Sequence, residues 1–167
     1  EEIVGKCVKN DIQLLFCVDS STNDIVWQKE LGKHGIQVII LDHHVIETLD
    51  QPDNVCLVNC KDQIYTNEEL SGTGVAFKLI EEVNNKMGDK YKGLIGNYEK
   101  YVGITIYSDY CCFMSKENRY FANRVFGEGN IFLLDGFLEY GLTAGALNFS
   151  LIPAINALIR TGCMKEA

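Results

Sequence analysis

Short apolar runs alternate with polar, helix-forming segments over the first part of the chain. The strands predicted by this pattern cover residues 13–18 (QLLFCV), 37–41 (QVIIL) and 55–58 (VCLV). An uninterrupted apolar run of this length is typical of a strand buried on both faces of a sheet. Residues 24–33 predict a helix between the first two strands, because residues 20–23 (SSTN) offer caps and residues 33–35 (KHG) an end. Strands separated by a helix indicate parallel βαβ units.

The remainder of the chain is predicted to be mostly helical. Helix-forming segments cover residues 74–87, 98–107, 117–126, 131–140 and 151–160. The predicted fold class is therefore α/β, with a parallel sheet flanked by helices that is followed by a mostly helical portion.

Composition excludes several classes of protein. The chain has 167 residues, of which 47% are hydrophobic and 23% charged, as in ordinary globular domains. A formal net charge of −8 argues against a smooth basic surface for duplex DNA. No run approaches about 18 consecutive apolar residues, so we expect no membrane-spanning helix, and no signal peptide is visible. The seven cysteines, an odd number lying mostly in apolar runs, are expected to be reduced and buried, as in a cytoplasmic protein.

Acidic residues and histidines follow two of the predicted strands. Asp19 comes after LLFCV, and Asp42, His43 and His44 come after QVIIL. Because the carboxyl ends of parallel strands meet at one edge of a sheet, these side chains are expected to converge there. Carboxylates with imidazoles suit Mn²⁺ or Mg²⁺. The alternative is that Asp19 caps the following helix and that the histidines lie in a polar turn.

Other polar residues in the later part of the chain are candidates for binding a metal ion or a phosphate. Asp109 lies among apolar neighbours (YVGITIYSDYCCFM), where it pairs with a base, caps a turn or ligates a metal. Ser71 and Gly72 precede a helix, where they hold a phosphate or form a cap and tight turn. Asn156 and Arg160 are spaced i, i+4 on one helix, and Arg160 contacts a nucleic-acid phosphate or makes a salt bridge.

Four ordered blocks of the sequence resemble the DHH phosphoesterases, and within them the RecJ-type single-strand-specific exonucleases. The blocks are residues 11–47 with the Asp-His-His triplet, 54–60 (NVCLVNC) with 70–80 (LSGTGVAFKLI), 102–121 around Asp109, and 149–162 (FSLIPAINALIRTG). The triplet alone is a weak match, but four blocks in order are a strong one. The last block, with Ile-Asn-Ala-x-x-Arg, favours the RecJ branch.

The resemblance implies a role for each matching residue. Asp19 would bridge two metal ions, His43 and Asp109 would ligate metal, His44 would face the scissile phosphate, and Asp42 would support a metal-site histidine. The implied cofactor is Mn²⁺ or Mg²⁺, with two ions in a complete family member. The implied reaction is hydrolysis of single-stranded DNA from an end, with Asn156, Arg160, Ser71 and Gly72 as candidates for substrate binding.

The sequence also departs from the family pattern. The family's first motif, an Asp-x-Asp on an upstream strand, has no counterpart, since Asp11 is the one aspartate in residues 1–18. The family's C-terminal substrate-binding domain has no counterpart either. The divergence of the sequence from the family pattern favours a phage source. The chain is therefore expected to be the central part of a cytoplasmic RecJ-like protein, unable by itself to assemble a full two-metal site.

This interpretation makes the chain a single partial DHH-type domain. Residues 1–64 would form the α/β layer, residues 65–147 a helical part with Asp109, and residues 148–167 the start of a connecting helix. Two alternatives remain open at this point. One is a non-catalytic DHH-fold module that binds partners or single strands, and the other is a DHH phosphoesterase acting on small nucleotides. The sequence does not indicate an oligomeric state.

Overall fold

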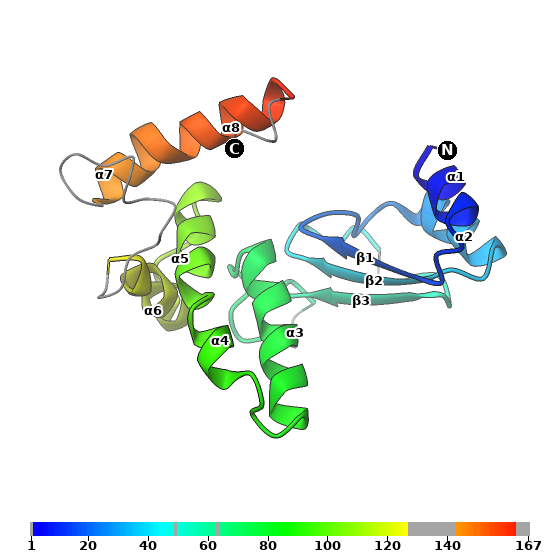
Figure 1. Ribbon diagram of the computed structural model, residues 1–167, viewed down its shortest axis with the longest axis horizontal. Coiled ribbons are helices and arrows are strands. Elements are labelled where there is room, and N and C mark those ends of the chain that lie inside the picture. Colours follow the sequence, from blue (N-terminus) through cyan, green and yellow to red (C-terminus); the bar gives the residue numbers. More distant parts are fainter. Residues whose placement is uncertain (1, 49, 63, 127–142, 163–167) are drawn as a thin grey trace. The chain divides into compact units, whose positions relative to one another are not determined.

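The computed structural model describes residues 2–48, 50–62, 64–126 and 143–162 of the chain. The chain divides into two compact units, Glu1–Tyr91 and Lys92–Ala167, which are shown together in Figure 1 and described one at a time below. The expectation of a single partial domain divided after residues 64 and 147 stays a prediction.

The first unit is a parallel sheet with helices beside it. The strands are β1 (Leu14–Val18), β2 (Gln37–Asp42) and β3 (Val55–Asn59), in the spatial order β1-β2-β3 (Figure 1). The helices are α1 (Glu2–Lys9), α2 (Ile25–Lys33) and α3 (Gly72–Lys86). The predicted strands, their parallel pairing and the helices after β1 and β3 are confirmed, whereas α1 was not predicted.

One face of the sheet packs against α1 and α2. Leu31 from α2 and Ile40 from the central strand are completely buried in this core, and Val4 and Cys7 from α1 close its side. The spacing of Val4 and Cys7, three residues apart, places both on one face of α1. The apolar side chains of β2 thus bury the apolar faces of both helices.

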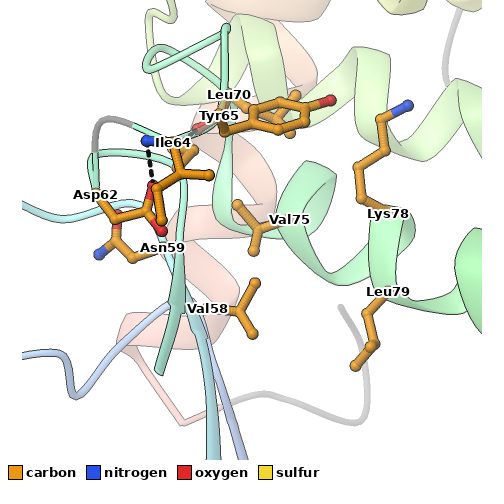
Figure 2. A pocket seen from close by; sticks show the side chains of 10 residues that line it. Val58, Asn59, Asp62, Ile64, Tyr65, Leu70, Val75, Lys78 and Leu79 are labelled. Atoms are coloured by element: carbon orange, nitrogen blue, oxygen red, sulfur yellow. Dashed lines mark hydrogen bonds between the residues drawn. The ribbon is translucent and has the colours of Figure 1, made fainter. Parts of the chain in front are cut away.

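The other face of the sheet is covered only in part. Helix α3 lies over it, but leaves a pocket of about 280 Å³ against β3 that is walled by Val58, Val75 and Leu79 (Figure 2). At the other edge, Leu14 and Phe16 of β1 are about half exposed, at 46% and 52%. The expectation that each strand is buried on both faces is therefore wrong for β1 and β3. Both are edge strands among the described residues, and α3 does not extend over the whole sheet.

The second unit is helical over the residues described. Its helices are α4 (Lys92–Gly96), α5 (Glu99–Ser108), α6 (Lys116–Val125), α7 (Ala144–Ala146), the π-helical turn η1 (Leu147–Leu151) and α8 (Ile152–Arg160). Helices α5 and α6 approach closely at Gly103, where a Cβ atom would meet the backbone of Phe121. Val125, Leu147 and Leu151 form the core that joins α6 to η1. The helices predicted over 98–107, 117–126 and 151–160 are confirmed, and the one over 131–140 lies outside the described residues.

Two expectations from composition can be compared with these units. No disulfide joins the six cysteines within the described residues, but Cys56 and Cys112 are exposed rather than buried as expected. They face outward because Cys56 lies on the partly covered sheet face and Cys112 in a loop. Among the described helices, none has both the length and the apolar character needed to cross a bilayer.

Helix α2 offers a direct test of which contacts stabilise the first unit. Leu31→Ala should lower the free energy of unfolding by about 2–5 kcal/mol, because Leu31 is fully buried and its loss leaves a cavity. Val26→Ala on the same helix should change it by less than about 0.5 kcal/mol, because Val26 is 86% exposed. Urea unfolding followed by circular dichroism measures both, and similar midpoints for the two variants would contradict this packing.

Candidate metal-binding site

Asp19 turns sharply away from the end of β1. Its backbone has a positive φ of 60°, a left-handed conformation that aspartate adopts more readily than most residues. Its amide donates a 2.8 Å hydrogen bond to the carbonyl of Leu41 on β2, so the turn is fixed to the neighbouring strand. The Asp19 carboxylate then lies 3.1 Å from His43, measured from its Oδ1 to Nε2 of the imidazole. Asp19 does not start α2, which follows Asp24 as its N-cap.

The side chains of Asp19, His43 and His44 form one cluster. One ligand atom of each lies within 4.8 Å of the others, and the two imidazole rings meet edge to face with centroids 4.9 Å apart. Two donors at right angles on an octahedral ion of the Mg²⁺ or Mn²⁺ size, with bonds of about 2.1 Å, are about 3.0 Å apart. The 3.1 Å separation of the Asp19 oxygen and the His43 nitrogen therefore fits two ligands of one such ion.

Asp42 differs from its neighbours because its side chain is completely buried. Its Oδ2 accepts hydrogen bonds from the hydroxyl of Thr22 at 2.6 Å and from the Thr22 amide at 3.2 Å. Its Oδ1 accepts from the amides of His43 and His44, at 2.8 and 3.3 Å, and contacts Nδ1 of His44 at 2.7 Å. The carboxylate thus holds the backbone and one ring of the histidine pair.

The ionised form of Asp42 is strongly favoured in the fold. Burial raises the pKa of this carboxyl group, but the hydrogen bonds from Thr22, His44 and the His43 amide outweigh burial and lower the pKa to about 2. An ionised carboxylate only accepts hydrogen bonds, so the proton in this contact is carried by Nδ1 of His44, which is the donor. The other ring nitrogen of His44, Nε2, is then the one that a ligand meets, and the His44 side chain is 60% exposed.

Asn59 at the end of β3 completes this network, although sequence reasoning did not single it out. It pairs in register with Asp42. Its amide nitrogen donates to the Thr22 hydroxyl at 3.0 Å and to the His44 carbonyl at 2.9 Å, while its oxygen accepts from the amide of Lys61. Thr22 was predicted only as one of several helix caps. A polar residue that directly follows an apolar strand, at the same sheet edge as Asp42, is the signal that could have identified Asn59.

Gly72 brings the start of α3 against Asp19. A Cβ atom at this position would overlap the Asp19 carboxylate, lying 2.7 Å from its Cγ, so no larger residue fits without displacing Asp19. The preceding Ser71 is buried and caps α3, because its hydroxyl accepts from the Gly74 amide at 3.2 Å. The part of Ser71 and Gly72 in substrate binding stays a prediction.

The remaining candidates belong to the second unit. Asp109 is an exposed residue at the C-cap of α5, where its amide donates to the Thr105 carbonyl at 2.9 Å and its carboxylate accepts from the Ser108 hydroxyl. Asn156 and Arg160 lie one turn apart on α8, with Asn156 exposed and Arg160 at its last residue. Metal binding by Asp109 and substrate binding by Asn156 and Arg160 stay predictions.

Comparison with known proteins places this site in a family. The sequence profile of the DHH family, N-terminal domain, matches residues 1–103, which include the complete Asp19, His43 and His44 cluster. The chain belongs to the DHH family. Within that family the chain is RecJ-like, as its relatives show.

The relatives are described as exonucleases of single-stranded DNA. YorK, a protein of the SPbeta prophage in Bacillus subtilis (strain 168) that is provisionally named a single-strand DNA-specific exonuclease, is 25% identical over 166 residues. The match covers 95% of this chain and 28% of YorK. RecJ of Haemophilus influenzae, a single-stranded-DNA-specific exonuclease, is 32% identical over 85 residues, or 50% of this chain and 15% of RecJ. The chain thus spans less than a third of these relatives.

Solved structures share the fold. The crystal structure of exonuclease RecJ bound to manganese superposes with a TM-score of 0.74 at 23% identity, covering 94% of this chain and 42% of that one. RecJ from Thermus thermophilus in complex with Mn²⁺ gives a TM-score of 0.75 at 22% identity, covering 96% of this chain and 25% of that one. These structures confirm a RecJ-type DHH fold.

The contact of Gly72 with Asp19 can be tested by adding one methyl group. Gly72→Ala should lower the free energy of unfolding by about 1–3 kcal/mol, because the new Cβ overlaps the carboxylate. Gly5→Ala is the matched control in α1, since nothing lies within 4 Å of its Cβ position, and it should stabilise the chain by up to about 1 kcal/mol. Chemical unfolding measures both, and stabilisation by Gly72→Ala would contradict the contact.

The low pKa of Asp42 predicts a step in acid stability. Its stabilising contribution is fully present above its ordinary pKa of 3.8 and is lost as the pH falls through about 2, where the folded form becomes protonated. The metal-free chain should lose about 2 kcal/mol of unfolding free energy across this range through Asp42 alone. Asp42→Asn should be less stable at neutral pH and should lack this part of the decline. Urea midpoints at several pH values measure it, and parallel acid profiles of the two proteins would refute the assignment.

Proposed function

We propose that this chain is the metal-binding core of a RecJ-like phosphodiesterase that hydrolyses single-stranded DNA from an end. The observation that carries the proposal is the cluster of Asp19, His43 and His44 at the carboxyl edge of a DHH-family sheet. The description of RecJ and YorK as exonucleases of single-stranded DNA supports the substrate class. The manganese in the RecJ structures supports Mn²⁺ as the ion, with Mg²⁺ as the other candidate. A cytoplasmic location and a phage source go with this proposal.

In this proposal Asp19 and His43 hold the ion, and Asp109 adds a further ligand. A bound divalent ion polarises a phosphoryl oxygen and lowers the pKa of a coordinated water, which is the chemistry that phosphodiester hydrolysis requires. The donor set of carboxylate oxygen and imidazole nitrogen suits such an ion. In a complete family member the resemblance implies two ions.

His44 acts on the phosphate rather than on the metal. Asp42 fixes the proton of His44 on Nδ1 and holds the ring in one orientation through the 2.7 Å contact. Nε2 then accepts a hydrogen bond from a substrate hydroxyl or water, or donates one to a phosphate oxygen when the ring is protonated. The buried Asp42 carboxylate keeps the ring in place while negative charge develops on the phosphate. Asn156 and Arg160, with the helix start at Ser71 and Gly72, are the proposed contacts to the DNA.

The second candidate is a DHH-fold module that binds single strands without cleaving them. Asp11, the one aspartate in residues 1–18, is exposed and precedes β1, whereas Asp19 follows that strand. The two therefore lie at opposite edges of the sheet, so Asp11 does not join the cluster of Asp19, His43 and His44. Action on short nucleotides is the third candidate, and a comparison of a single-stranded oligonucleotide with dinucleotides as substrates separates it from the first.

The proposal is tested by metal binding. Titration calorimetry with Mn²⁺ should give saturable binding in the micromolar range for the chain, and His43→Ala should weaken this binding by at least about 100-fold, because a ligand is removed. His34→Ala is the matched control, since His34 is an exposed residue next to Glu30 at the end of α2, and it should bind Mn²⁺ as the wild type does.

The outcomes separate the candidates. Binding that is lost only in His43→Ala supports the metal-dependent phosphodiesterase, and Mn²⁺-dependent release of nucleotides from single-stranded DNA would complete it. No Mn²⁺ binding by a chain that is folded according to circular dichroism would contradict the metal centre and favour the non-catalytic module.

A further inference from the structure

The loop between α5 and α6 carries large side chains that face solvent. Tyr110 is 82% exposed and Met114 is 84% exposed, and Phe113 beside them is 41% exposed. Three large, mainly apolar side chains exposed within five residues are more than a loop needs for its own stability. Tyr110 directly follows Asp109, the candidate ligand.

The backbone of this loop is held in place despite its exposed side chains. Cys111 is buried, and its amide donates to the Ile106 carbonyl of α5 at 3.0 Å. From α6, Asn118 donates its side-chain amide to the Cys112 carbonyl at 2.9 Å. The guanidinium of Arg119 donates to two successive carbonyls, those of residues 113 and 114, at 2.6 and 2.8 Å. The exposed side chains are therefore presented by a fixed backbone.

Phe113 packs against other aromatic rings. Its ring packs on Tyr107 of α5 with centroids 5.2 Å apart, and Tyr107 in turn meets Phe126 at 5.7 Å. Phe113, Tyr107 and Phe126 therefore form one aromatic cluster within the second unit. Tyr110 and Met114 are the more exposed members of the loop.

Tyr110 also has an unfavourable backbone conformation. Its φ is +53°, in the left-handed region where a helix normally ends with glycine. The other described non-glycine residues with positive φ are aspartates and a serine, which tolerate this region better than a tyrosine does. An exposed tyrosine gains little packing in return. Strain that is retained without a gain in stability points to a function of the side chain.

We propose that Tyr110, with Phe113 and Met114 exposed in the same loop, is a stacking platform for a base of single-stranded DNA. This inference rests on the proposed function, which supplies the DNA, and it adds the surface that holds the strand beside Asp109. Aromatic rings stack on the face of any base, so such a platform binds single strands with little sequence preference.

The loop lacks the acidic excess that would repel a nucleic acid, and it carries cations near its aromatic residues. The chain carries a net charge of −8, but at this loop Lys116 and Arg119 balance Asp109 and Glu117, so the acidic excess does not continue here. The guanidinium of Arg119 lies against the backbone of Phe113 and Met114. Flat rings with neighbouring cations are the combination that single-strand binding uses, one for the bases and the other for the phosphates. A fixed loop also binds a base without a large ordering cost.

The experiment compares Tyr110→Gly with the wild type for stability and for binding. The probe is a short fluorescein-labelled oligothymidine, measured by fluorescence anisotropy in EDTA so that it is not hydrolysed. Tyr110→Gly should raise the melting temperature by about 2–4 °C, because glycine relieves the left-handed backbone. The same variant should bind the oligothymidine about 5- to 150-fold more weakly, because a stacked base is lost. Tyr110→Phe should bind as the wild type does.

Two controls isolate stacking from other effects. Asp11→Gly replaces another exposed residue of positive φ, at 52°, and should raise the melting temperature without weakening binding. A strand of the same length made of abasic deoxyribose phosphates should bind wild type and Tyr110→Gly alike, because it offers no base to stack.

Each outcome has one meaning. A more stable Tyr110→Gly that binds oligothymidine weakly, with the abasic strand unaffected, supports the platform. Wild-type binding by Tyr110→Gly overturns the platform and leaves the proposed function standing. If the wild type binds no oligothymidine while the chain is folded and binds Mn²⁺, the platform is overturned and the metal centre is not.

Discussion

The buried carboxylate of Asp42 is the feature on which the candidate site depends. It receives hydrogen bonds from the chain before α2, from its own following residues and, through Thr22, from β3. A charge in such a position is tolerated only when its oxygens are satisfied, and here they are. Because both histidines that follow Asp42 are bonded to it through their amides, the orientation of the cluster is set by a group that solvent does not reach.

The network links all three strands of the sheet. Thr22 follows β1, Asp42 ends β2 and Asn59 ends β3, so a side chain from each strand end or the loop after it contributes one part. Removing any one of them leaves a buried donor or acceptor without a partner, and such groups cost more than an ordinary hydrogen bond contributes. The site is therefore an extension of the first unit's packing rather than a set of surface residues. The same holds for Asp19, because its amide donates a hydrogen bond to the carbonyl of Leu41 on β2 at this edge.

The sequence was informative where local pattern decides the structure. Apolar runs identified the three strands, and the rule for the edge of a parallel sheet brought Asp19 and the Asp-His-His triplet together. Sequence reasoning failed where the structure depends on contacts between residues that are distant in the chain. The β1 residues were expected to be buried, but only the central strand has cover on both sides. Thr22 and Asn59 bond each other across 37 residues of sequence, a relation that no spacing rule indicates. Helix α1 is short and contains Gly5 near its centre, and both features lower its intrinsic tendency to form a helix.

The contact between Gly72 and Asp19 has an evolutionary consequence. The carboxylate occupies the volume that a side chain at position 72 would fill, so the two positions share one space. A lineage that keeps the aspartate must keep the glycine, whereas a lineage in which position 19 becomes a smaller residue is released from that restriction. The two positions should therefore vary together among descendants of this chain. The residue at position 72, at the start of α3, therefore indicates whether the aspartate at position 19 has been kept.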